Sequence, residues 1–98
     1  MIVKIHVCER IIMAACDESL LGQKIVDGKY QLDLSSRYYN GERISEANLL
    51  GLIKKADILN FVGTEATRFL VNNGIIEQGD IKKIKDVPYS QVVLIRSN

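Results

Sequence analysis

The chain has few of the residues from which small proteins build covalent or metal-based sites. Its 98 residues include one histidine, two cysteines, one proline and no tryptophan. Two cysteines, Cys8 and Cys16, are too few for a disulfide scaffold, and their spacing fits no zinc pattern. The single histidine, His6, would need carboxylate or thiol partners to bind a metal or relay a proton. We therefore expect no metal site and no disulfide between the two cysteines.

An excess of one charge and long apolar runs are also missing. Thirteen Lys and Arg against 12 Asp and Glu give a net charge of +1, so nucleic-acid binding would need a local basic patch. No apolar run approaches the roughly 20 residues that span a bilayer, and the first residues lack the features of a signal peptide. No P-loop, dinucleotide fingerprint or nucleophile elbow is present. We expect a cytoplasmic protein with no membrane contact and no cofactor.

The remaining composition, 47% hydrophobic and 26% charged, is typical of one globular domain covering residues 1–98. Alternating and continuous apolar runs predict a hairpin over residues 2–16 and further strands at 29–34, 81–87 and 91–95. With a turn centred on Glu9 and Arg10, residue 3 faces residue 16. This register places on one face Val3, Ile5, Val7, Ile12, Ala14 and Cys16. The run 92–95 is apolar on both faces, which predicts a central place in the sheet.

Residues 45–73 are predicted to form a helical pair that packs on one face of the sheet. Ser45 can cap the first helix, and an apolar stripe runs through it as far as Leu59 or Asn60. Gly63 and Thr64 kink the segment or separate two helices, and a glycine at position 74 ends the second. The expected fold class is α+β, with a mixed or mainly antiparallel sheet of about five strands.

Two helices can cover only one face of such a sheet, whereas the first hairpin is apolar on both faces. Something should cover the second face, because a bare apolar patch of several hundred Å² is unusual for a soluble monomer. A symmetric homodimer would cover it. The alternative is that the turn at 17–22 and the loop at 35–43 fold back over it.

Three groups of residues are candidates for binding. The amide Asn60 lies in an apolar segment and needs a partner, which is either a neighbouring loop or a ligand. The loop 35–43 carries Tyr38, Tyr39 and Arg43, which could stack an unpaired base or could close the core as a hydrophobic flap. A third group could bind phosphates or could protect a strand edge from aggregation, and it consists of Lys82, Lys83 and Lys85.

A catalytic cleft is the competing possibility. Cys16 precedes a predicted helical turn, whose dipole would stabilise a thiolate, although its place on the predicted core face favours a small buried hydrophobe. A cleft on this basis would combine Cys16, Asp17, Asn60 and Gln91.

Four short segments in series resemble a small single-domain archaeal family of uncharacterised proteins, a domain of unknown function. They are Ala15-Cys16-Asp17 with Leu20-Leu21-Gly22 and Lys24, Tyr38-Tyr39 with Gly41-Glu42, Asn60 with Val62-Gly63, and Val87-Pro88 with Gln91-Val92. The family pattern often has histidine where this chain has Tyr89, which removes an acid or base from that position. The resemblance implies an archaeal cytosolic protein and no established activity.

We interpret the chain as a non-enzymatic binding module for RNA or for a translation-linked protein partner, with a small enzyme as the alternative. A binding module should present Tyr38, Tyr39, Arg43 and the lysines on one exposed surface. An enzyme should gather Cys16, Asp17 and Asn60 in a concave pocket.

Overall fold

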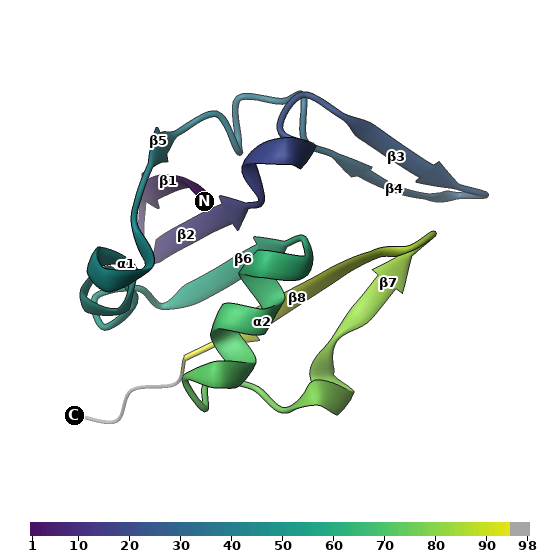
Figure 1. Ribbon diagram of the computed structural model, residues 1–98. Coiled ribbons are helices and arrows are strands. Elements are labelled where there is room, and N and C mark those ends of the chain that lie inside the picture. The colour runs from purple at the N-terminus through teal and green to yellow at the C-terminus, as the bar shows by residue number, and fades with distance from the viewer. Residues whose placement is uncertain (95–98) are drawn as a thin grey trace.

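A six-stranded mixed sheet forms the centre of the computed structural model, which describes residues 1–94 (Figure 1). Across the sheet the strand order is β5-β1-β2-β6-β8-β7. The β2–β6 pair is parallel and the other neighbouring pairs are antiparallel. The strands are β1 (Ile2–Val7), β2 (Ile11–Cys16), β5 (Glu42–Arg43), β6 (Ile58–Val62), β7 (Lys82–Ile84) and β8 (Val87–Val93).

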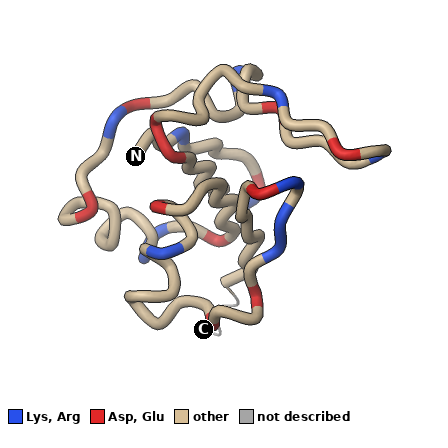
Figure 2. The backbone as a smooth tube through the Cα atoms, turned by 45° about the vertical axis from the view of Figure 1, so that its right-hand side comes forward, with Lys and Arg blue, Asp and Glu red and all other residues tan. Residues whose placement is uncertain are grey.

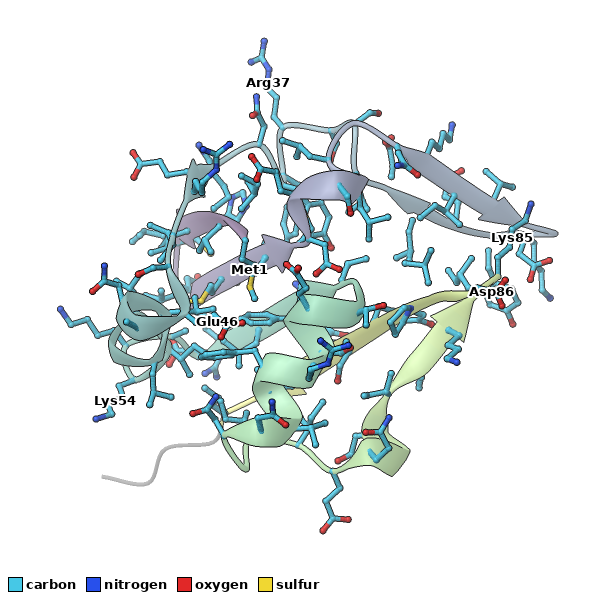
Figure 3. The ribbon with its side chains drawn as sticks, viewed as in Figure 1. Met1, Arg37, Glu46, Lys54, Lys85 and Asp86 are labelled. Atoms are coloured by element: carbon cyan, nitrogen blue, oxygen red, sulfur yellow. The ribbon has the colours of Figure 1, made fainter. Side chains whose placement is uncertain are left out.

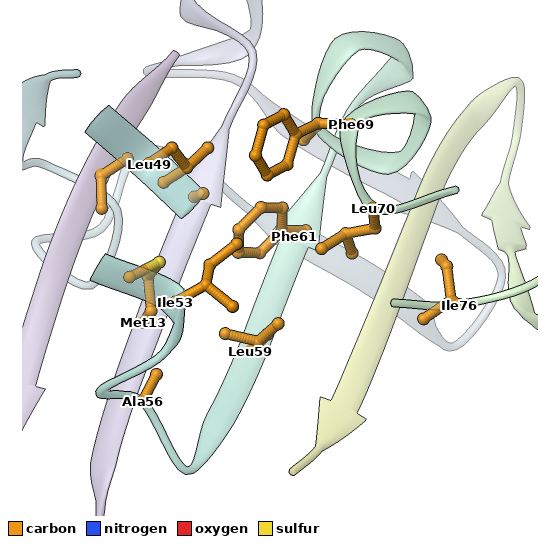
Figure 4. Packing of buried hydrophobic residues seen from close by; sticks show 12 residues of the cluster. Met13, Leu49, Ile53, Ala56, Leu59, Phe61, Phe69, Leu70 and Ile76 are labelled. Atoms are coloured by element: carbon orange, nitrogen blue, oxygen red, sulfur yellow. The ribbon is translucent and has the colours of Figure 1, made fainter. Parts of the chain in front are cut away.

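Two helices, α1 (Glu46–Ile53) and α2 (Thr64–Asn72), cover one face of the sheet, which we call the helix face. The side chains between the two layers are apolar and almost completely buried (Figure 4). Those contributed by the sheet include Met13, Leu59 and Phe61, and those contributed by the helices include Leu49, Ile53, Phe69 and Leu70. This layer is the main hydrophobic core.

The opposite face, which we call the second face, is covered by chain that is mostly not helical. A separate hairpin of β3 (Lys24–Asp27) and β4 (Tyr30–Asp33) extends from the sheet as an arm (Figure 1). A short 3-10 turn at Glu18–Leu20 precedes this hairpin, and a second 3-10 turn, at Gln78–Asp80, lies elsewhere, before β7. Leu34 and Tyr39 pack with Cys16 and Val62 in a smaller buried cluster on this face. The fold is thus the expected α+β class, with six strands in the main sheet.

The predicted register of the first hairpin is wrong by one residue. Ile2 pairs with Cys16 and Val7 pairs with Ile11, so the turn contains three residues, 8–10. A shift of one residue turns every side chain of a strand to the other face. Cys16 therefore lies on the second face. The residues of β2 that lie on the helix face are Ile11, Met13 and Ala15. Cys8 is exposed in the turn, and both cysteines are free thiols as expected.

The helical prediction for residues 45–73 also needs correction, because a strand separates the two helices. Ile58–Val62 forms β6, with β2 on one side and β8 on the other. Its β-branched and aromatic residues favour a strand, and a short apolar run fits a buried strand as well as a helix. Asn60 accordingly lies on a central strand. Gly74, with a φ of 70°, follows the end of α2 as predicted.

The strands near the C-terminus differ in their bounds. β7 and β8 are joined at Lys85 and Asp86, so Pro88 and Tyr89 belong to β8 itself. β8 is an interior strand, as expected for its apolar residues, although Val93 is 60% exposed. Ile95 lies outside the described residues. β3 is not among the predicted strands.

The loop 35–43 and the segment after β2 fold back over part of the second face, as one of the two alternatives requires. The remainder of this face keeps partly exposed aliphatic side chains, Ile12, Ile58 and Val93. Self-association therefore stays a prediction. Sedimentation equilibrium at micromolar concentration should show a mass above 11.0 kDa if two copies pair, and a single species at that mass would exclude the dimer.

Candidate functional site

Three side chains from distant parts of the chain meet on the second face. Asn60 of β6 donates a hydrogen bond of 2.6 Å from Nδ2 to the Tyr38 hydroxyl. The Tyr38 ring stacks on the imidazole of His6, with ring centroids 4.4 Å apart and planes inclined by 15°. His6 Nε2 also donates to the carbonyl oxygen of Tyr38, at 2.9 Å. The partner of Asn60 is therefore a loop residue, and three contacts fix this loop to the sheet.

Gln91 lies beside this group. It pairs with Asn60 across β6 and β8, which puts both amides on the second face. The Gln91 side chain is exposed and makes no hydrogen bond within the described part of the chain. We define the Tyr38 cluster as His6, Tyr38, Asn60 and Gln91. A small hollow of about 190 Å³ adjoins it, lined in part by Asn60, Gln91, Tyr39 and Tyr89.

The two neighbouring tyrosines have different environments. Tyr39 packs against the buried cluster of Cys16 and Val62, and its ring meets that of Tyr38 edge-on with centroids 5.1 Å apart. Burial, followed by the proximity of Tyr38 and Cys16, raises the pKa of Tyr39 to about 12. Tyr39 thus closes the core, while Tyr38 borders the open part of the face.

Cys16 and Asp17 do not join Asn60 and Gln91 in a cleft. Cys16 is fully buried, and burial together with the nearby Asp17 raises its pKa to about 11. The thiol is therefore protonated near neutral pH and has no access to a substrate. The Asp17 carboxylate accepts hydrogen bonds from the backbone N–H groups of Glu65 (3.0 Å) and Ala66 (2.9 Å).

These two bonds make the Asp17 side chain the cap of α2. Gly63 immediately precedes the helix with a φ of 116°, and a Cβ at this position would overlap the Asp17 carboxylate. The buried Asp17 carboxylate thus explains why position 63 is a glycine, since only glycine leaves room for it. Both are required to join the end of β2 to the start of α2.

The remaining predicted residues lie at opposite edges of the sheet. Arg43 is on β5 and forms an ion pair with Glu18. Lys82 and Lys83 are on β7, at the other edge, and their side chains alternate between the two faces. Lys85, with a φ of 52°, is in the turn beyond them. The expected single surface of tyrosines, Arg43 and lysines does not form.

The sequence does not predict that His6 and Gln91 belong to the Tyr38 cluster. His6 contacts Tyr38, and Gln91 pairs with Asn60, and only the strand order and the path of the loop bring them there. No local signal could have found these contacts. Arg68, by contrast, shares helical spacing with Thr64 and Asn72, so a polar face of α2 was visible in the sequence.

Two kinds of site are not seen in residues 1–94. No three His, Cys, Asp or Glu side chains group there in a way that could hold a metal ion. No helix in the same residues is long and apolar enough to cross a membrane.

The arrangement described so far defines a small α+β domain with helices on one face of a mixed sheet and a hairpin with its loop on the other. The chain belongs to the family described as "Protein of unknown function (DUF424)", whose sequence pattern matches residues 5–95. This family membership confirms the resemblance that its motifs indicated. No curated protein matches the chain.

A solved structure shares this fold. It is the crystal structure of an uncharacterized conserved protein from Methanopyrus kandleri, with a TM-score of 0.82 and 22% sequence identity. The alignment covers 99% of this chain and 94% of that one. The similarity extends over the whole domain and establishes the fold.

Proposed function

We propose that the protein is a non-enzymatic, cytoplasmic module that binds single-stranded RNA on the open part of the second face. The observation that carries this proposal is the Tyr38 cluster, in which an aromatic pair and two amides lie together on the surface of a sheet. Proteins that read unpaired RNA stack its bases on aromatic side chains and bond to the base edges.

The two amides suit the edges of bases. Asparagine and glutamine each carry both a donor and an acceptor, which is also the pattern that a base edge presents. Asn60 uses one of its donors for Tyr38, whereas Gln91 is free to bond outward. Next to them, Ile12, Ile58 and Val93 offer apolar surface for the flat sides of the bases.

Two cations stand next to the cluster. Lys4 lies on the second face, because it pairs with Ala14 in the same cross-strand row as Asn60 and Gln91. Arg37 directly precedes Tyr38 and extends outward from the loop (Figure 3). Neither takes part in an ion pair within residues 1–94. Both can therefore neutralise phosphates of a bound strand.

Fluorescence anisotropy with labelled 12-nucleotide RNA of single-base composition tests the proposal. We expect saturable binding that weakens steeply with salt, and a loss of about tenfold or more in affinity for Tyr38→Ala, because stacking on an aromatic ring contributes about 1–3 kcal/mol per base. Tyr30→Ala is the matched control, since Tyr30 is 62% exposed on the β3–β4 arm.

Loss of the Tyr38 ring could also loosen its loop, so a second variant keeps the ring. The double variant Lys4→Gln and Arg37→Gln should reduce the slope of log affinity against log salt concentration by the equivalent of about two phosphate contacts. Its thermal stability should stay unchanged. The RNA proposal fails if the wild-type protein binds no RNA at low ionic strength. It also fails if Tyr30→Ala weakens binding as much as Tyr38→Ala does.

A further inference from the structure

A second candidate site lies on the helix face, between α2 and the β7 edge. A groove of about 300 Å³ separates these elements. One wall is a face of α2 that runs from the buried Thr67 and the partly buried Val71 to exposed residues, and its residues follow helical spacing: Thr64, Thr67, Arg68, Val71 and Asn72. The other wall comes from the 3-10 turn before β7 and from the β7–β8 hairpin: Gln78, Ile81, Lys83, Asp86 and Pro88.

The groove holds two cations on opposite walls. Arg68 comes from the helix and Lys83 from the edge strand, and neither takes part in an ion pair within the described residues. Figure 2 shows the basic residues of the β7 segment as blue stretches along one edge of the molecule. Two unpaired cations that line one groove repel each other, and an anion between them would remove that repulsion.

Neutral hydrogen-bonding groups line the same groove. The side chains of Thr64, Asn72 and Gln78 form no hydrogen bond within residues 1–94. Thr67 differs, because its hydroxyl donates to the carbonyl oxygen of Gly63 at 2.9 Å. The groove thus offers a guanidinium fork, an ammonium group and several free polar groups. A guanidinium beside an ammonium and hydroxyl is a combination that suits phosphate oxygens.

The remaining lining residues indicate the size and type of the ligand. Asp86 adds one carboxylate, so the charged lining is two cations and one anion. This balance disfavours a polyanion and provides an acceptor for a hydroxyl group of the ligand. Val71, Ile81 and Pro88 add apolar surface, and the volume reaches the lower end of the range for small-molecule sites.

We infer that this groove binds a small hydroxyl-bearing phosphate monoester of nucleotide or sugar-phosphate size, held by Arg68 and Lys83. The site lies on the opposite side of the sheet from the Tyr38 cluster and does not rest on the RNA proposal. Its phosphate could come from a small molecule or from the backbone of an RNA strand. The lining charge favours the small molecule.

A ¹⁵N-resolved NMR titration of the full chain with AMP tests this inference. AMP should shift the amide signals of residues 64–72 and of Lys83 in a saturable way, whereas adenosine, which lacks the phosphate, should not. Arg68→Gln and Lys83→Gln should each weaken AMP binding about tenfold, because each removes a charge-assisted contact. Lys54→Gln is the matched control, since Lys54 is exposed and far from the β7–β8 turn (Figure 3).

Two further measurements distinguish a small-molecule phosphate from an RNA phosphate and separate this site from the proposed RNA surface. An RNA pentamer with a 5′-hydroxyl end carries only phosphate diesters, and tighter binding of this pentamer than of AMP would overturn the small-molecule source. Tyr38→Ala should leave AMP binding unchanged, which separates this site from the RNA surface. Absence of saturable shifts at the groove, or shifts that survive both cation substitutions, would overturn the site itself.

Discussion

The two faces of the sheet differ in how deeply their side chains are buried and in what covers them. On the helix face, Phe61 and Leu59 are fully buried among apolar side chains from two helices. On the second face, the neighbouring positions of the same strand carry Ile58 and Asn60, which are only partly buried. A loop, a hairpin and a few polar contacts form the cover there. One strand therefore contributes both to a closed core and to a more open surface.

The difference implies that the core on the helix face contributes more to stability than the open part of the second face. Truncation of Phe61 to alanine should reduce the free energy of unfolding by about 3 to 5 kcal/mol, because a large buried ring leaves a cavity. Truncation of Val93, which is 60% exposed on the second face, should change it by less than about 0.5 kcal/mol. Urea unfolding of both variants measures the contrast, and similar losses would mean that the two faces are equally important for stability.

The junction between the two faces gives the next largest effect. Gly63→Ala should cost about 2 kcal/mol or more, since alanine resists this backbone conformation and its Cβ displaces the Asp17 carboxylate that caps α2. Gly28→Ala is the control. Gly28 also has a positive φ, of 62°, but nothing lies within 4 Å of the added Cβ. If the two variants lost the same stability, the contact with Asp17 would have no special role.

The two faces of the sheet differ in how much of their structure could be predicted from the sequence. The α+β class and the end of α2 before Gly74 could be predicted from local sequence pattern, because apolar spacing indicates a helix and a glycine indicates where it ends. The register of the first hairpin failed because Glu-Arg does not fix a two-residue turn, and β1 and β2 are apolar enough on both faces to accept either pairing.

The candidate site was harder to derive. The need of Asn60 for a partner could be stated from its apolar neighbours, and a loop was among the expected partners. The identity of that partner could not be predicted, because Tyr38 is 22 residues away and reaches Asn60 only through the path of the loop over β1. The sequence places Asp17 in a possible cleft, whereas its role as the cap of α2 depends on the parallel pairing of β2 with β6.

The polar contacts of the second face should have smaller energies than the core. Asn60→Leu should cost about 1 to 2 kcal/mol, because it leaves the half-buried Tyr38 hydroxyl without its donor. Tyr38→Phe removes the other half of this bond, and the double variant should be less destabilised than the sum of the two. Additive losses in urea unfolding would show that the two side chains are not coupled.

A further effect is confined to alkaline solution, and two groups in the closed part of the second face should contribute to it. The pKa of Tyr39 rises from 10.0 to about 12, and that of Cys16 from 9.0 to about 11, both mainly through burial. For both groups the folded state favours the neutral form more than the unfolded state does. Their contribution to stability is therefore complete below pH 9 and is lost as the pH rises through the two folded-state pKa values.

Tyr39→Phe isolates one of these groups, because it keeps the ring and removes the ionisable hydroxyl. Above pH 10 this variant should lose less stability with rising pH than the wild-type protein does, since no buried phenolate has to form. Tyr30→Phe is the control, because Tyr30 is 62% exposed and should leave the pH profile unchanged. Urea midpoints measured between pH 8 and pH 12 test the comparison. Parallel profiles for the wild type and Tyr39→Phe would show that Tyr39 ionises as freely as an exposed tyrosine and that this part of the second face is open as well.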